Sequence, residues 1–235
     1  MASRIRPLAV VAYRGAPQLC PPGSTVASLR KAVELKASGL MVDVRRTRDD
    51  ILVIDHDAVR MVDDREVPLH AKSLSEWRAR TADTDTPMAT LDEAMSIAAS
   101  AKIGLILDFR ESGTEALLAR AIRGSGFPLD SILVTGADAT SRVILRGLDP
   151  RIPLGHTLGF GEGARINAKL LADLDVDAVT WHHRLITGPI ANILHLRDIR
   201  VYGLHADLAE DIRRLRDACK VDGIITSAPD LTRAV

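Results

Sequence analysis

Short apolar runs alternate with helix-forming stretches along most of this chain, and that alternation restricts the fold more than any other feature of the sequence. Unbroken apolar runs are typical of parallel strands that are covered on both faces, and parallel strands need a long crossover, usually a helix, between them. Strands are therefore predicted at residues 8–13, 40–44, 103–109, 131–135, 152–154, 178–181, 200–204 and 223–226.

Helices are predicted between these strands, at residues 25–36, 91–101, 115–123, 139–146, 189–196 and 208–218. A further helix is predicted after the fifth strand and ends at residue 171. Eight strands, each but the last followed by a helix, predict a single (β/α)8 barrel domain over residues 1–235. A chain of this length with 46% hydrophobic residues can fill one large core. A doubly wound open sheet is the alternative, but no Gly-x-Gly-x-x-Gly motif opens the first helix, which weakens a dinucleotide-binding interpretation.

Two segments depart from the alternation. After the second strand, a short apolar run at residues 51–54 leads to His56 and Asp57, and the polar stretch 59–87 follows. This stretch is interpreted as an irregular excursion over the top of the barrel. A glycine-rich loop follows the short strand predicted at residues 152–154.

Charge and composition exclude several classes of partner. The chain has 31 basic and 31 acidic residues and only 3% aromatic residues. Proteins that bind nucleic acids or membrane surfaces usually carry a basic excess, and single-strand binders need aromatic stacking platforms. The apolar run from Leu8 is too short for a signal sequence because Arg14 closes it, and no window approaches membrane-spanning length. We expect no nucleic-acid partner, no membrane insertion and a cytoplasmic location.

Polar residues fall where the predicted strands end. Active sites of (β/α)8 barrels lie at the carboxyl ends of the strands, and Arg14, Asp43, Asp108 and Arg110 are all expected there. Four histidines are also expected near strand ends: His156, His182, His183 and His205.

An aspartate inside an apolar strand is costly unless its carboxylate is paired or bound to a metal. Asp43 and Asp108 both have this setting. Together with Arg14 and Arg110, they suit a hard divalent cation and a phosphate. They suit equally well a set of buried aspartate–arginine pairs that hold the barrel together. The spacing alone leaves both interpretations open.

The order of these motifs resembles that of the glycerophosphodiester phosphodiesterases along nearly the whole chain. The family's opening His-Arg-Gly is similar to residues 13–15, and its Glu-Leu-Asp-Val strand is similar to residues 41–44. Its Val-x-His-Asp and Glu-Ile-Lys motifs resemble residues 54–57 and 108–110. Its closing Gly-Ile-Ile-Thr-Asp-x-Pro-Asp resembles residues 223–230. The resemblance implies a (β/α)8 barrel of the phospholipase-C-like phosphodiesterase type.

The resemblance also implies a reaction. In the family, a glycerophosphodiester is hydrolysed to glycerol phosphate and an alcohol, in lipid metabolism, with one divalent metal (Mg²⁺ or Ca²⁺). Two histidines act as general base and general acid, and the metal and cationic side chains offset the charge that develops on the phosphoryl oxygens. By this resemblance His56 is catalytic, Arg14 and Arg110 bind phosphate, and Asp43 and Asp108 hold a weakened metal site.

The chain departs from the family's pattern at decisive positions. Tyr13 replaces the first catalytic histidine, and a phenol with an ordinary pKa of about 10 is a poor base at neutral pH. Met41 replaces a metal-binding glutamate, and a thioether is a soft ligand that matches Mg²⁺ or Ca²⁺ poorly. Asp108 is one methylene shorter than the family's glutamate, and Arg110 replaces its lysine. Loss of a general base alone typically costs about 10²–10⁴ in rate, so we expect impaired or altered catalysis.

Two hypotheses about function therefore remain open. The chain is either a divergent phosphodiesterase or a non-catalytic barrel that binds a phosphorylated small molecule, such as a glycerophosphodiester, in a regulatory role. One form of the first hypothesis has the site rebuilt from histidines, because imidazole suits borderline metals such as zinc. The candidates for such a replacement site are His156, His182, His183 and His205.

Overall fold

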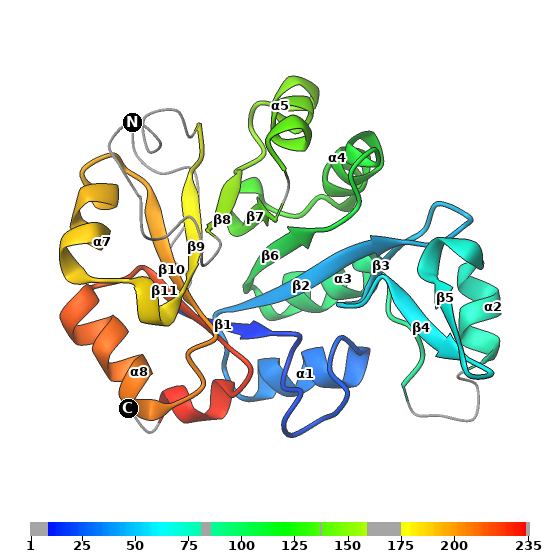
Figure 1. Cartoon of the computed structure of the whole chain (residues 1–235), viewed down its shortest axis with the longest axis horizontal. Helices are drawn as coiled ribbons and strands as arrows, with labels where there is room; N and C mark the ends of the chain where they lie inside the picture. The colour runs from blue at the N-terminus through cyan, green and yellow to red at the C-terminus, as the bar shows by residue number, and fades with distance from the viewer. Residues whose placement is uncertain (1–8, 81–85, 137, 159–174, 234–235) are drawn as a thin grey trace.

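The computed structural model describes residues 9–80, 86–136, 138–158 and 175–233. Parallel strands form a nearly closed barrel in the order β7–β6–β2–β1–β11–β10–β9–β8 (Figure 1). The strands are β1 (Val10–Tyr13), β2 (Gly39–Arg46), β6 (Gly104–Phe109), β7 (Ile132–Thr135), β8 (Gly155–Leu158), β9 (Ala178–His182), β10 (Arg200–Leu204) and β11 (Gly223–Thr226). The prediction of a (β/α)8 barrel is confirmed.

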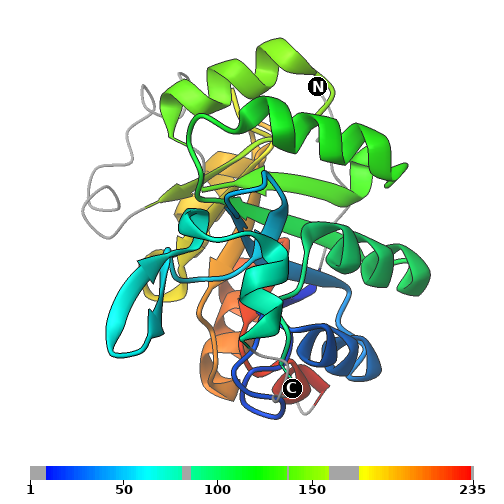
Figure 2. The same cartoon turned by 90° about the vertical axis from the view of Figure 1, so that its right-hand side faces the viewer.

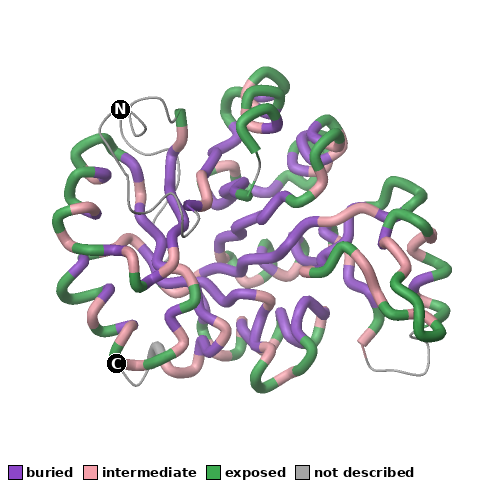
Figure 3. The backbone as a smooth tube through the Cα atoms, viewed as in Figure 1, coloured by how far each residue is buried: buried purple, intermediate pink, exposed green. Residues whose placement is uncertain are grey.

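The helices lie outside the strands and cover them (Figure 1). Their inner faces are apolar and buried, as are the strands, while their outer faces are exposed (Figure 3). Their bounds are α1 (Val26–Glu34), α3 (Leu91–Ala101), α4 (Glu115–Ser125), α5 (Ala139–Leu148), α7 (Gly188–His195) and α8 (Ala209–Arg213). The outer face of α5 includes the exposed apolar residues Val143, Ile144 and Leu148. In the part of the chain that the structure describes, no helix is both long and apolar enough to cross a membrane.

The hydrophobic core has two layers because successive residues of a strand point to opposite faces of the sheet. Residues that point inward fill the barrel, among them Val11, Met41 and Ile106. Residues that point outward pack against the helices in two clusters. One cluster joins β2, β6 and β7 to α1, α3, α4 and α5, and the other joins β8–β11 to α7 and α8.

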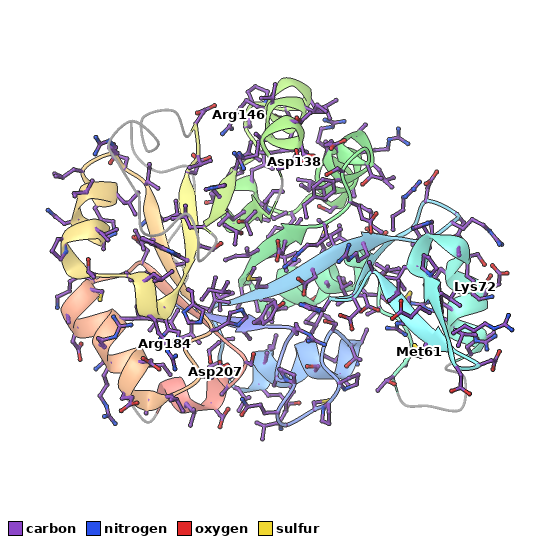
Figure 4. The ribbon with its side chains drawn as sticks, in the orientation of Figure 1. Met61, Lys72, Asp138, Arg146, Arg184 and Asp207 are labelled. Carbon is purple, nitrogen blue, oxygen red and sulfur yellow. The ribbon has the colours of Figure 1, made fainter. Side chains whose placement is uncertain are left out.

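The interpretation of residues 59–87 as irregular is wrong over most of its length. A hairpin of β4 (Val59–Val62) and β5 (Arg65–Pro68) is followed by helix α2 (Leu74–Ala79), and these elements project from one side of the barrel (Figures 1 and 2). Both hairpin strands are partly exposed, and Val62 and Val67 pack against a small cluster that includes Leu69 and Trp77, so their sequence has no continuous apolar run. Met61, which is 65% exposed, marks this outlying hairpin in Figure 4.

The strand predicted at residues 152–154 begins later, as β8. Leu154 forms an isolated bridge with Val134 of β7, and the helix predicted up to residue 171 lies outside the described residues. The polar Thr157 interrupts the apolar pattern that predicts a strand, although its hydroxyl forms hydrogen bonds inside the barrel. It lies 2.9 Å from the hydroxyl of Thr135 and accepts a hydrogen bond from that of Thr180 at 2.9 Å. The hydrogen bond between Thr135 and Thr157 joins β7 to β8, where the described residues form an isolated backbone bridge.

Candidate active site

Asp43 and Asp108 lie side by side at the carboxyl ends of β2 and β6. They are register partners across this parallel pair, and their side chains are 0% and 4% exposed. Because side chains two apart on a strand share a face, Asp43 stands directly above Met41, whose side chain belongs to the apolar barrel interior. Two adjacent buried carboxylates require a positive charge or a proton between them.

Arg110 supplies that positive charge. Its Nη2 atom lies 3.2 Å from Oδ1 of Asp43 and also forms an ion pair with Oδ2 of Asp108. Burial alone would lower the pKa of Arg110, but the Asp108 and Asp43 carboxylates outweigh that effect and raise it. The guanidinium therefore stays protonated. The buried aspartate–arginine pairing that the sequence allowed is therefore present in the structure.

One guanidinium does not balance two carboxylates. Burial, followed by repulsion from Asp108, raises the pKa of Asp43 to about 6. Among the described residues, nothing donates a hydrogen bond to Oδ2 of Asp43 or to Oδ1 of Asp108. The carboxylate pair therefore takes up a proton near pH 6, at a higher pH than an exposed aspartate does.

Gly136 leaves room for Asp108. It follows β7 in the left-handed conformation, with φ of +76°, and a Cβ atom built there would overlap Oδ1 of Asp108. A side chain at this position would push the carboxylate away from Arg110.

Replacing Gly136 by alanine is expected to lower the free energy of unfolding by about 1–3 kcal/mol, because a non-glycine residue is strained at this φ and its Cβ displaces Asp108. Urea unfolding measures the loss. Gly113→Ala is the matched control: Gly113 has φ of +90° with nothing within 4 Å of a built Cβ, so it carries the strain without the overlap. A loss for Gly136→Ala no larger than that of the control would contradict the role of Gly136.

Tyr13 ends β1 and donates its hydroxyl hydrogen to Oδ1 of Asp43, over an oxygen–oxygen distance of 3.4 Å. Burial raises the pKa of Tyr13 above its ordinary value, and the charges of Asp43 and Asp108 raise it further. The phenol therefore stays protonated at neutral pH. It can donate a hydrogen bond, but it cannot act as the base that the family's histidine provides.

His56 lies at the mouth of the barrel because β2 extends beyond the mouth and β3 (Leu52–Ile54) leads the chain back to it. β3 pairs antiparallel with β2, and the backbone N–H of Asp55 donates to the carbonyl oxygen of Asp43 at 3.0 Å. The His56 side chain is 43% exposed, and its Nδ1 atom lies 2.8 Å from Oδ1 of Asp57. Its hydrogen bond lowers the pKa of Asp57. The histidine thus has a carboxylate that can orient its ring.

Arg45 holds two of these groups together, and sequence reasoning missed it. Its Nη2 atom donates to the carbonyl oxygen of His56 at 3.0 Å, and its Nη1 atom donates to that of Arg110 at 3.2 Å. Nη1 also lies 3.6 Å from the carboxylate of Glu111. The available signal was the spacing, because Arg45 lies two residues after Asp43 and therefore on the same face of β2.

Arg14 follows β1 directly, in the left-handed conformation with φ of 58°. Its backbone N–H donates to the carbonyl oxygen of Met41 at 2.9 Å, and its Nη2 atom donates to that of Pro22 at 3.3 Å. Its buried Nε atom has no acceptor among the described residues. The charge of Arg14 contributes, after the His56 hydrogen bond, to the lowered pKa of Asp57.

The four histidines that were expected near strand ends have different neighbours. The ring of His205 meets that of Tyr13 edge-on, with centroids 5.5 Å apart, and the centroid of His182 lies 6.1 Å from that of His205. His183 instead faces Asp211 of α8, with Nδ1 at 3.0 Å from the carboxylate. His156 lies 3.0 Å from Nη1 of Arg142 on α5. Burial lowers the pKa of His182, His183 and His205. His156 therefore belongs to a contact between β8 and α5, whereas the ring of His183 also lies beside that of His182, with centroids 4.6 Å apart.

The side chains present do not fit the divalent metal implied by the family resemblance. Over the described residues, no three or more histidine, cysteine, aspartate or glutamate side chains are grouped to hold a metal ion. Met41 lies in the apolar interior, and Arg110 contacts one oxygen of each remaining carboxylate. A hard cation needs several oxygen ligands, whereas Asp43 and Asp108 already share the guanidinium.

The fold and the mouth residues define a (β/α)8 barrel whose carboxyl-end face carries the charged side chains and the histidine, as in barrel enzymes. The model of the glycerophosphoryl diester phosphodiesterase family matches residues 14–231. The chain belongs to this family. No curated protein sequence matches it significantly.

Solved structures of similar fold have low sequence identity to this chain. A phosphodiesterase from Oleispira antarctica, in complex with the product sn-glycerol-3-phosphate, has a TM-score of 0.82 and 20% identity, covering 97% of this chain and 96% of that one. A glycerophosphodiester phosphodiesterase from Agrobacterium tumefaciens has a TM-score of 0.79 and 19% identity, covering 97% and 100%. The corresponding enzyme from Thermotoga maritima has a TM-score of 0.78 and 16% identity, covering 97% and 98%. At these identities the likeness establishes the fold.

Proposed function

We propose that the mouth of the barrel binds a phosphorylated small molecule such as a glycerophosphodiester, and that hydrolysis of the diester is impaired. The observation that carries this proposal is the protonated phenol of Tyr13, which donates to Asp43 at the position where the resemblance implies a general base. Membership of the phosphodiesterase family supports the substrate class. A role in lipid metabolism would follow from that substrate class.

Arg14 is the first candidate to bind the phosphate. Its positive charge helps to lower the pKa of Asp57, and its buried Nε–H has no protein acceptor among the described residues. Arg110 is the second candidate, because 39% of its side chain is exposed at the mouth. Planar guanidinium groups suit the bidentate recognition of phosphate oxygens. The bound sn-glycerol-3-phosphate of the Oleispira antarctica phosphodiesterase supports a ligand of this chemistry here.

His56 is the candidate catalytic residue. With its ring oriented by Asp57, a protonated His56 would give its proton to the leaving alcohol oxygen, and Arg14 and Arg110 would offset the charge on the phosphoryl oxygens. Tyr13 cannot take the proton from an attacking water or hydroxyl group at neutral pH. His56 is therefore a candidate for the general acid, whereas Tyr13 cannot serve as the general base.

The binding half of this proposal is tested by thermal melts with sn-glycerol 3-phosphate. A ligand at about 100 times its Kd stabilises the folded state by about 2.7 kcal/mol, so the wild-type melting temperature should rise with ligand concentration. Arg14→Gln should remove most of the rise. Arg48→Gln is the matched control, because Arg48 lies away from the mouth and pairs with Glu76. A wild-type protein that glycerol phosphates do not stabilise would contradict the proposal.

Turnover separates the divergent enzyme from the non-catalytic binder. Slow release of glycerol phosphate from a glycerophosphodiester, abolished by His56→Ala, would identify a divergent phosphodiesterase. Stabilisation by glycerol phosphates without any turnover would identify the phosphate-binding, regulatory barrel. The hydrogen bond from Tyr13 to Asp43 is the observation that favours the non-catalytic binding function.

A further inference from the structure

We infer that the guanidinium of Arg110 takes the place of the divalent cation at this site, so that phosphate binding requires no metal ion. This deepens the proposed function and rests on it for the phosphate ligand. Its basis is the joint contact of one Arg110 nitrogen with Asp43 and Asp108.

The position of Arg110 is built into the sheet. Asp43 and Asp108 are register partners, so their carboxylates lie at the same height in the barrel. The N–H of Arg110 donates to the carbonyl oxygen of Val44 at 3.3 Å, which continues the β2–β6 pairing one step beyond the carboxylates. The carbonyl of Arg110 is held in turn by Arg45. The backbone is thus fixed just above the carboxylates, and the side chain folds back onto them.

This arrangement competes directly with a divalent cation. Such an ion would need an oxygen from each carboxylate and would have to share both carboxylates with Arg110, because Oδ1 of Asp43 and Oδ2 of Asp108 already contact Nη2 of Arg110. Oδ2 of Asp43 has no donor among the described residues, but it is buried. Oδ1 of Asp108 packs against the backbone of Gly136 instead of pointing into an open space. An ion beside the guanidinium would also meet a like charge at short range, and like charges repel strongly in such a partly buried setting.

A permanent guanidinium differs from a metal ion in a useful respect. It cannot dissociate, and the arginine keeps its proton throughout the physiological pH range. It also carries several N–H donors, whereas both ion pairs with the carboxylates use Nη2 alone. The exposed part of Arg110 can therefore face a phosphate while the buried edge neutralises the carboxylates. The site keeps a cation for its ligand without depending on the supply of metal.

The direct test is titration calorimetry of Mg²⁺ and Ca²⁺ against three metal-free proteins, the wild type, Arg110→Met and the control Arg48→Met. We expect no site-specific binding to the wild type or the control. The cation affinity of Arg110→Met should be about tenfold or more higher than that of the wild type. The guanidinium charge that repels the ion is gone, and both carboxylates are free to bind it. Adding Asp43→Asn to Arg110→Met should remove the gain.

Two results would overturn the inference. The first is saturable binding of Mg²⁺ or Ca²⁺ to the wild type that Asp43→Asn abolishes. The second is a folded Arg110→Met protein, judged by circular dichroism, with no higher cation affinity than the wild type. Should Arg110→Met not fold, Arg110→Gln carries the same test.

A second measurement uses the wild type alone and separates this inference from the proposed function. Thermal stabilisation by sn-glycerol 3-phosphate should be unchanged after EDTA treatment and after addition of Mg²⁺ or Ca²⁺. Stabilisation that appears only with added metal would overturn the inference while supporting the proposed function. Stabilisation by the ligand under neither condition would contradict the proposed function, and the calorimetric test would still decide the role of Arg110.

Discussion

Restoring the family's residues at three positions is expected to create metal-dependent phosphodiester hydrolysis in this barrel. The variant combines Tyr13→His, Met41→Glu and Arg110→Lys. It returns a general base to the end of β1, adds a hard oxygen ligand beneath Asp43, and removes the guanidinium from between the carboxylates. A general base contributes about 10²–10⁴ in rate, so turnover of a glycerophosphodiester with Mg²⁺ or Ca²⁺ should exceed that of the wild type by about that factor.

The three substitutions should act together and not singly. Tyr13→His alone supplies a base without a metal, and Met41→Glu alone buries a charge in a position that is 1% exposed, which should lower stability. Adding His56→Ala to the triple variant is the control and should return the rate to background. A triple variant that folds and binds metal, yet is no faster than the wild type, would show that the three positions do not account for the impairment.

The stability of the metal-free protein is expected to carry a pH dependence that comes from Asp43. The pKa of Asp43 is raised from 3.8 to about 6 in the folded state. The folded state therefore binds a proton more tightly than the unfolded chain, and this contribution is fully present below about pH 4 and is lost as the pH rises through 6. With 1.36 kcal/mol per pKa unit, the loss is about 2–3 kcal/mol.

Asp43→Asn should remove this pH dependence, because the amide stays neutral throughout. Between pH 4 and pH 7, the unfolding free energy of Asp43→Asn should rise by about 2–3 kcal/mol relative to that of the wild type, measured by urea unfolding in EDTA. Asp149→Asn is the control. Hydrogen bonds from Arg151 lower the pKa of Asp149 to about 2, so its contribution is constant from pH 4 to pH 7 and is lost only in stronger acid. A difference between Asp43→Asn and the wild type that stays constant over this range would exclude a raised pKa.

The barrel could be predicted because its signal is local. Apolar runs such as 103–109 mark strands that are buried on both faces, and β6 (Gly104–Phe109) falls within that run. The β4–β5 hairpin and the start of β8 could not be predicted in the same way, because their residues do not form continuous apolar runs. In β8, Thr157 finds its hydrogen-bond partners on β7 and β9, and the local sequence does not reveal those partners.

In the candidate site too, local features could be predicted from the sequence, whereas contacts that depend on tertiary structure could not. The strand ends placed Asp43, Asp108 and Arg110 at one mouth, and the structure brings these three residues together. That Arg110 bridges the two carboxylates depends on the register of β2 against β6, which is a tertiary property. His156 was expected near the mouth but contacts Arg142 of α5, because the direction of a side chain at a strand end depends on how the strand packs on its helices.

The junction between β7 and β8 has a consequence for how the barrel opens. An isolated bridge and the hydroxyls of Thr135, Thr157 and Thr180 join these strands, whereas β2 and β6 share six paired positions. Separate outer clusters support the chain on the two sides of this junction. Over the described residues, the barrel therefore closes most weakly between β7 and β8, and we expect the backbone amides of these two strands to exchange faster than those of β2 and β6.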